Sequence, residues 1–193
     1  WDWGLEPLVQ LFICGDASEP GDPRSPPVCA AILKGAGQAA YFAVPVPASL
    51  LQSLKPRKKQ IALLELLWPV LACFVWSRFL FKAHVILYED NEGARFALLR
   101  AMSAHSDINI LLAYFWGAAA THKSKWFFER VASGDNAADC LTKPGLDRSH
   151  LTGARDMTHD VNWHPLFTQI ADVLNTHSLP SFSHIQEIVA DFS

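Results

Sequence analysis

Residues 83–94 read Ala-His-Val-Ile-Leu-Tyr-Glu-Asp-Asn-Glu-Gly-Ala, and this stretch decides the fold. Its first half is a run of apolar, β-branched and aromatic residues, which is typical of a buried strand. The run ends in an acidic group, after which apolar residues recur at helical spacing (Phe96, Leu98, Leu99 and Met102). The pattern therefore predicts that Asp90 lies at the carboxyl end of a strand, where ligands bind in α/β folds. The alternative is that Asp90 and Asn91 form only a turn or a helix cap.

Three further apolar runs precede this stretch, at residues 10–15, 28–33 and 38–44. A loop rich in Pro and Gly at 19–27 and a Lys-Gly-Ala-Gly turn at 34–37 separate them. We expect an antiparallel meander of three strands, with Asp16 near the end of the first. After the central stretch, the pattern predicts helices at 92–102 and through 110–116, a fifth strand at 125–131, and a short helix at 137–142.

The longest apolar segment, residues 61–81, is broken only by Glu65, Ser77 and Arg78. Its length of about 20 residues would suit a transmembrane helix. Glu65 and Arg78 are costly in lipid, however, and Pro69 would kink the helix one turn beyond Glu65. We therefore expect a helix buried beneath a sheet, with Glu65 at the edge of its apolar face, and no membrane partner.

The composition fits one domain of about 150 residues plus an extension. Half of the 193 residues are hydrophobic and 18% are charged, which excludes a disordered chain. The net charge of −3 argues against binding of nucleic acid by overall charge, although a local basic patch beside an acidic site is compatible with it.

Four scattered cysteines without metal-ligand spacing predict reduced thiols in an intracellular protein, of the cytoplasm or nucleus. Because the chain begins with Trp1 and not Met, we expect a piece of a longer polypeptide.

Four carboxylates from distant parts of the chain fall at or near predicted element ends or in the first long helix: Asp16, Glu65, Asp90 and Asp139. If they meet at one end of the sheet, they cannot all stay ionised unless hard cations neutralise them. Two Mg²⁺ ions about 4 Å apart, held in this way, are the machinery of phosphodiester hydrolysis.

These pieces together resemble the ribonuclease H domain of retroelement (copia-like retrotransposon) reverse transcriptases, over about residues 8–145. The matching pieces are Asp16-Ala17-Ser18 with its hairpin, Glu65 in the helix after three strands, residues 90–94, and Asn136-Ala137-Ala138-Asp139-Cys140-Leu141-Thr142-Lys143-Pro144, which is similar to the N-x-A-D-x-x-T-K-P ending of copia-type elements. The resemblance implies an α/β ribonuclease H-like fold with a five-stranded mixed sheet, three antiparallel strands then parallel strands, flanked by helices. Residues 1–145 would form this domain, and residues 146–193 a helical C-terminal extension or linker.

The resemblance also implies a metal-dependent endonuclease that cuts the RNA strand of RNA–DNA hybrids. Its partner would be a reverse transcriptase polymerase domain in the same polyprotein. Asp16, Glu65, Asp90 and Asp139 would be the catalytic residues and would hold two Mg²⁺ ions, with Mn²⁺ as a possible substitute. Contacts to the nucleic acid are expected from Lys58, Lys59, Asn91, Lys123 and Lys125. The basic cluster at 55–59 is by itself more typical of a solvated helix entry, and its position just before Glu65 makes contact with a phosphate backbone the competing interpretation.

Three departures from the family pattern keep an alternative open. Pro69 lies close to Glu65, the loop before the last carboxylate contains no His, and Asp135 rivals Asp139 as the fourth ligand. The alternative function is a catalytically weak or inactive ribonuclease H-like scaffold or nucleic-acid-binding module. The histidines after residue 146 lack metal-ligand spacing, and two amphipathic helices are expected there, around 165–175 and 183–192.

Overall fold

The computed structural model describes residues 9–19, 25–56 and 60–192. Its strands are β1 (Gln10–Ser18), β2 (Val28–Gly35), β3 (Gln38–Pro45), β4 (His84–Glu89), β5 (Lys125–Arg130) and β6 (Arg155–Asp156). Its helices are α1 (Ala48–Ser53), α2 (Ile61–Val75), α3 (Ser77–Leu80), α4 (Glu92–Arg100), α5 (Ser106–His122), α6 (Asp139–Thr142), α7 (Trp163–Thr176) and α8 (Phe182–Asp191), with 3-10 turns η1 (Ser133–Asp135) and η2 (Ser149–Leu151).

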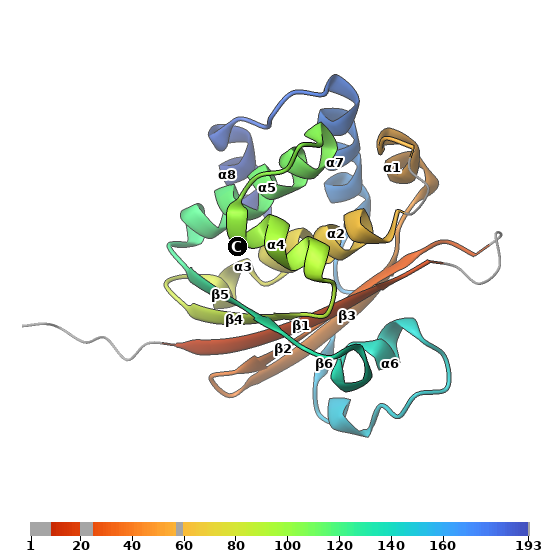
Figure 1. The fold of residues 1–193 in the computed structure, drawn as a ribbon. Coiled ribbons are helices and arrows are strands. Elements are labelled where there is room, and N and C mark those ends of the chain that lie inside the picture. Colours follow the sequence, from red (N-terminus) through yellow and green to blue (C-terminus); the bar gives the residue numbers. More distant parts are fainter. Residues whose placement is uncertain (1–8, 20–24, 57–59, 193) are drawn as a thin grey trace, which may run out of the picture.

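One mixed sheet, in the order β5-β4-β1-β2-β3-β6, runs through the described residues (Figure 1). Strands β1, β2 and β3 form the predicted antiparallel meander, and β4 and β5 continue it in parallel to β1. Ala36 and Gly37 close the β2–β3 hairpin with positive φ at both positions, as a tight turn of this kind requires. The prediction of five strands is one too few, because Arg155 and Asp156 pair with β3 as a sixth. A strand of two residues carries no periodic pattern by which it could be recognised.

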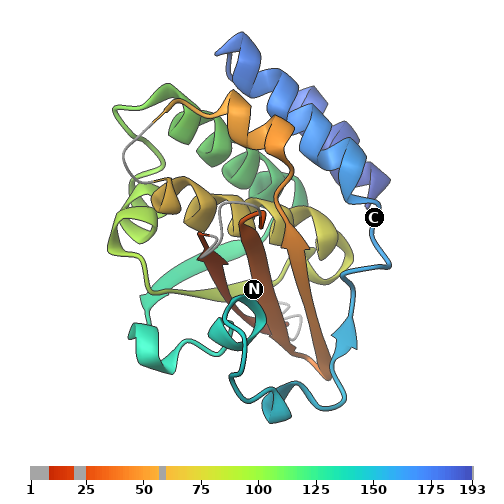
Figure 2. The same ribbon diagram turned by 90° about the vertical axis from the view of Figure 1, so that its right-hand side faces the viewer.

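Helices cover one face of the sheet, while α6 and η2 lie against part of the opposite face (Figures 1 and 2). Helix α2 packs on β1 and β2 and is flanked by α4 and α5, so every residue from Leu63 to Val75 is buried. It is therefore buried on all sides over this range, and the predicted division into an apolar face with Glu65 at its edge does not apply. Pro69 lies inside this helix and removes the hydrogen bond that the carbonyl of Glu65 would otherwise accept.

The apolar segment that could have been a membrane span is divided at Trp76 into α2 and α3. With 15 residues, α2 is the longer of the two. Within the described ranges, no helix combines the length and the apolarity that a bilayer crossing demands.

The residues after 145 share the main hydrophobic core. Helix α7 contacts α1, and α8 contacts α5. Leu166, Ile170 and Ile188 belong to the same buried cluster as Leu11 and Trp68. Both helices that the amphipathic pattern predicts in this region are present, and the domain boundary after residue 145 stays a prediction.

A second, smaller cluster lies on the opposite face of the sheet. Ala30 and Ile32 of β2 contact Cys140 and Leu141 of α6 and Leu151 of η2 there. All four cysteines are free thiols; Cys14 is half-buried, and Cys29, Cys73 and Cys140 are buried. This small cluster holds α6 against β1 and β2, beside the end of β1 that carries Asp16.

Candidate metal centre

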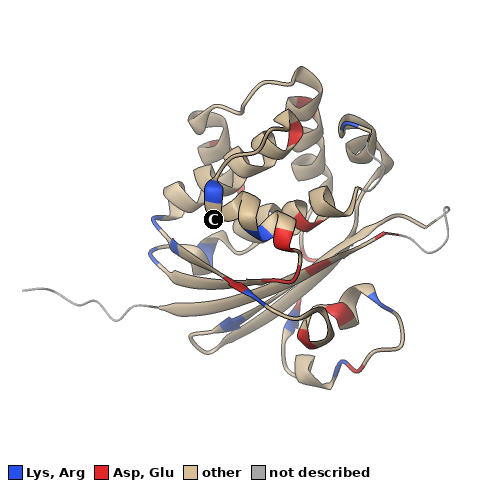
Figure 3. Ribbon diagram, viewed as in Figure 1, with Lys and Arg blue, Asp and Glu red and all other residues tan. Residues whose placement is uncertain are grey.

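Three of the four predicted carboxylates meet at one end of the sheet. One oxygen from each of Asp16, Glu65 and Asp90 lies within 4.8 Å of the others. The register of β1 and β4 explains why, because Cys14 is paired with Tyr88 and the two aspartates each follow two residues later. Parallel neighbouring strands thus place both aspartates at the same edge. Figure 3 shows acidic segments on β1, on α2 and after β4 in this part of the ribbon.

Glu65 reaches this edge because α2 lies unusually close to β1. Gly15 makes this approach possible, since a Cβ built there would lie 2.2 Å from the ring of Trp68, one turn along the helix from Glu65. The backbone N–H of Ala17 in β1 donates a hydrogen bond to the Glu65 carboxyl group. Contact between the helix and the strand therefore fixes the position of this carboxyl group.

The carboxyl groups are buried, and their environment opposes ionisation. Asp16 is 3% exposed and Glu65 is 4% exposed. Burial, followed by the charges of Glu89, Asp16 and Asp90, raises the pKa of Glu65 to about 10. Burial is also the main cause of the raised pKa of Asp16. Such a set of groups becomes favourable when a cation supplies the missing positive charge.

Glu89 is a further carboxyl group in this region that the sequence did not predict; it adjoins the compact group of Asp16, Glu65 and Asp90 without belonging to it. It is fully buried, and its pKa is raised well above the usual range by burial and by the charges of Asp90 and Asp16. The signal in the sequence is its place directly before Asp90, at a strand position where an apolar residue is typical. That signal indicates a site residue only once the residue is known to face the protein interior.

Asp139, the remaining predicted ligand, lies next to the compact group without belonging to it. One of its oxygens accepts a bond from the Lys143 ammonium at 2.5 Å, and the other is buried without a partner. Its charge raises the pKa of Asp16, whose carboxylate accepts a hydrogen bond from the Thr142 hydroxyl. The rival Asp135 is exposed on η1, so the geometry favours Asp139.

Asn136 fastens this last segment to the sheet. Its buried side chain donates from Nδ2 to the Gly15 carbonyl at 2.8 Å, and its Oδ1 accepts the N–H of Ala138 at 3.1 Å. Asn136, Thr142 and Lys143 belong to the motif at 136–144, in which the sequence predicted a role for Asp139 alone. Each makes a contact that joins the motif to β1 or to Asp139.

Of the predicted nucleic-acid contacts that the structure describes, Asn91 adjoins the carboxylates, and Lys123 and Lys125 do not. Lys58 and Lys59 lie outside the described residues. Asn91 does adjoin the site, where its side chain caps α4 by accepting the N–H of Ala94 at 3.1 Å, as the alternative interpretation of this stretch proposed. Lys123 and Lys125 are exposed at the far end of the sheet, because Lys125 is paired with the first residue of β4. At about 3.3 Å per residue, the strand places them roughly 20 Å from Asp90.

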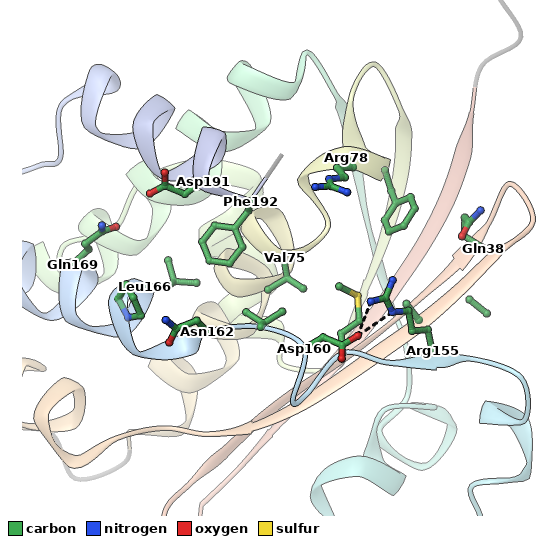
Figure 4. A pocket seen from close by; sticks show the side chains of 16 residues that line it. Gln38, Val75, Arg78, Arg155, Asp160, Asn162, Leu166, Gln169, Asp191 and Phe192 are labelled. Carbon is green, nitrogen blue, oxygen red and sulfur yellow. Dashed lines mark hydrogen bonds and ion pairs between the residues drawn. The ribbon is translucent and has the colours of Figure 1, made fainter.

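A cavity of about 470 Å³ lies elsewhere, between β3, the end of α2, α7 and the end of α8 (Figure 4). Val75, Leu166 and Phe192 line its apolar part, and Arg155 and Asp160 form an ion pair at its edge. None of the residues predicted from the sequence as site residues lines this cavity. The acidic group at the ends of β1 and β4 is therefore the candidate site.

The donor set of that group fits a hard divalent cation. It consists of carboxylate oxygens, which Mg²⁺ and Mn²⁺ prefer over nitrogen or sulfur. Oε2 of Glu65 and Oε2 of Glu89 are both buried without a hydrogen-bond partner, so the site holds acceptors that the polypeptide leaves unsatisfied. The geometry can thus bind a cation and hold it against β1 and β4.

Comparisons with known proteins assign the chain to no family. No protein-family model matches the chain. No curated protein matches it at a significant level. Among solved structures, it is similar to the crystal structure of RNase H1 from the halophilic archaeon Halobacterium salinarum NRC-1, with a TM-score of 0.48 and 14% identity over 66% of this chain and 89% of that chain. At this level of likeness, functional residues cannot be transferred, and the functional assignment depends on the geometry of the carboxylates.

Proposed function

We propose that this chain is a metal-dependent endonuclease of the ribonuclease H type, which hydrolyses the RNA strand of RNA–DNA hybrids. The observation that carries the proposal is the convergence of Asp16, Glu65 and Asp90, with oxygens within 4.8 Å of one another, at the carboxyl ends of two parallel strands. Burying carboxylates together is unfavourable unless they are paired or bind metal. Such a group is therefore typical of a site that binds divalent cations.

The proposed ligands and catalytic residues are Asp16, Glu65, Asp90 and Asp139, and the proposed cofactors are two Mg²⁺ ions, with Mn²⁺ as a substitute. When bound, two such cations activate the attacking water and stabilise the leaving oxygen. The protein's own contribution is to fix the ligand oxygens: Thr142 holds Asp16 by a hydrogen bond, and Asn91 caps the helix that follows Asp90. Lys143 adds a positive charge beside Asp16, which suits the binding of a substrate phosphate.

The substrate class and the partner are proposed from the motif resemblance at 16–18, 90–94 and 136–144. A hybrid would be distinguished from DNA through the 2′-hydroxyl groups of its RNA strand in the minor groove. The proposed partner is a reverse transcriptase polymerase domain within a retroelement polyprotein. Lys123 and Lys125 are proposed contacts for a part of the duplex remote from the metal centre.

The test is cleavage of an end-labelled RNA–DNA hybrid with Mg²⁺ and then with Mn²⁺, for the unaltered chain, Asp90→Asn and Asp135→Asn. We expect cleavage that requires metal, is abolished in Asp90→Asn and persists in Asp135→Asn, since Asp135 is exposed on η1. The two variants make the same chemical change, so a general loss of charge cannot explain a difference between them. Cleavage that survives Asp90→Asn would contradict the assignment of the site.

One observation favours a second candidate, a nucleic-acid-binding module with weak or no activity. Asp139 is engaged by Lys143 and does not belong to the compact carboxylate group. A site with only three available ligands could bind metal and hybrid without turnover. Retention of the hybrid in a binding assay, with no cleavage in either metal, would favour this candidate.

A further inference from the structure

Glu89 occupies a strand position that suits an apolar residue. Along β4, Val85 and Leu87 face the helical layer, and Glu89 follows them in the same register; all three are 0% exposed. A hydrophobic side chain would occupy this position without electrostatic cost. An ionised carboxyl group is strongly unfavourable there unless it has a cationic partner.

One oxygen of the Glu89 carboxyl group is satisfied and the other is not. Oε1 accepts the backbone N–H of Asn91 at 3.0 Å, while Oε2 is buried without a hydrogen-bond partner. Oε2 of Glu65 is in the same situation, and Glu89 is the strongest charge acting on Glu65. Because buried polar atoms almost always have a partner, these two oxygens indicate a group that the polypeptide does not supply.

We propose that Glu89 is an inner cation ligand of the metal centre, which binds through Oε2 together with Glu65. This inference rests on the proposed metal-dependent function. It extends the ligand set to a residue that lies deeper in the protein than the half-buried Asp90. Carboxylate oxygens of this kind suit Mg²⁺ and Mn²⁺.

The charge balance of the site agrees with this assignment. Lys143 neutralises Asp139 through their ion pair. The remaining carboxylates are Asp16, Glu65, Asp90 and Glu89. With the Asp139–Lys143 pair counted as neutral, these four negative charges equal the positive charge of two divalent cations, whereas the same set without Glu89 would leave one positive charge in excess.

A purely structural role for Glu89 makes a different prediction from a ligand role. As an acceptor for the N–H of Asn91, Glu89 could be replaced by Gln, whose amide oxygen has the same reach. Asp would be a poorer replacement in that role, because its carboxyl group is one methylene shorter. A cation ligand needs the negative charge, so Asp would then be the better replacement and Gln the worse.

The experiment is isothermal titration of metal-free protein with Mn²⁺, for the unaltered chain, Glu89→Gln, Glu89→Asp, Asp90→Asn and Glu129→Gln. The last variant is the matched control, since Glu129 is an exposed carboxylate on the neighbouring strand β5. We expect Glu89→Gln to weaken Mn²⁺ binding at least 10-fold, Glu89→Asp to weaken it less, and Glu129→Gln to leave it unchanged.

The outcomes separate this inference from the function on which it rests. If Asp90→Asn weakens binding and Glu89→Gln binds as tightly as the unaltered chain, Glu89 is not a ligand, and the metal centre stands without it. If the unaltered chain binds no Mn²⁺, the metal centre itself is refuted, and the inner ligand with it. If Glu89→Gln does not fold, Glu89→Asp decides: weakened Mn²⁺ binding with an unchanged melting temperature of the metal-free protein supports the ligand role, and binding equal to that of the unaltered chain overturns it.

Discussion

Replacement of Gly15 by Ala tests whether the contact between α2 and β1 determines both the stability of the fold and the metal centre. The new Cβ would lie 2.2 Å from Cδ2 and 2.4 Å from Cε3 of Trp68, where ordinary contacts begin at 3.4 Å. The ring must therefore move by about 1.2 Å, the difference between 3.4 and 2.2 Å. Trp68 is 0% exposed and cannot swing toward solvent, so the helix or the strand has to shift.

The expected cost follows from this displacement. Overpacking of a well-packed core costs about 1–3 kcal/mol. For a chain of this size, each kcal/mol lowers the melting temperature by roughly 2–4 °C, so we expect Gly15→Ala to lower it by about 2–12 °C. Because Glu65 is one turn from Trp68 on α2, its carboxyl group is expected to move relative to Asp16, and Mn²⁺ binding should weaken in parallel.

The assay is differential scanning calorimetry with Mn²⁺ titration of the same samples. Gly134→Ala is the matched control, because Gly134 is exposed and a Cβ there meets nothing within 4 Å. Trp68→Leu in the Gly15→Ala background should recover part of the lost stability, with a coupling energy of about 1 kcal/mol or more in the double-mutant cycle. A melting temperature for Gly15→Ala equal to that of Gly134→Ala would refute the reasoning.

Three further predictions concern single side chains. Asn136→Ala leaves the buried Gly15 carbonyl without its donor at 2.8 Å, and should lower the free energy of unfolding in urea by about 1–3 kcal/mol. The control is Asn162→Ala, which should change this free energy little because Asn162 is exposed and its side chain makes no capping bond. Burial lowers the pKa of His122 from 6.5 to about 4. The contribution of its neutral form to stability is therefore complete above pH 6.5 and is lost as the pH falls toward 4. His122→Gln cannot gain this proton, so its melting temperature should fall less between pH 7 and 5 than that of the unaltered chain. Asn91→Ala removes the cap of α4 and should cost about 1 kcal/mol, and Asn91→Ser should restore most of it; equal stability of the two variants would argue against the capping role.

The parts of the fold that the sequence predicts well are those with a local pattern. The change from strand to helical spacing around Asp90 places β4 and α4 correctly, and the turn residues define the β1–β3 meander. The Asp139–Lys143 ion pair has the four-residue spacing of helical partners and could have been foreseen from that spacing alone. Strand direction is informative as well, because in a parallel pair Lys125 at the start of β5 must lie far from Asp90 at the end of β4.

Other features depend on contacts between distant segments and leave little local signal. The burial of Glu89 depends on helices that pack over β4, and the residues around Glu89 do not indicate their position; the alternation of Val85, Leu87 and Glu89 along β4 is the one local signal. Helix α2 has no polar face to indicate its orientation, because protein surrounds it on every side. The second hydrophobic cluster forms only when α6 and η2 reach the open face of the sheet, and β6 is too short to show a period.

The hydrogen bonds between β1 and residues 136–142 can form only late in the synthesis of the chain. Asn136 and Gly15 are 121 residues apart, and Thr142 and Asp16 are 126 residues apart. At about 5–20 residues per second, a ribosome makes the second partner of each pair roughly 6–25 s after the first. During that interval, the β1–β3 meander exists without the segment that bonds to Gly15 and Asp16. Formation of these two long-range contacts is therefore a late step of folding during synthesis.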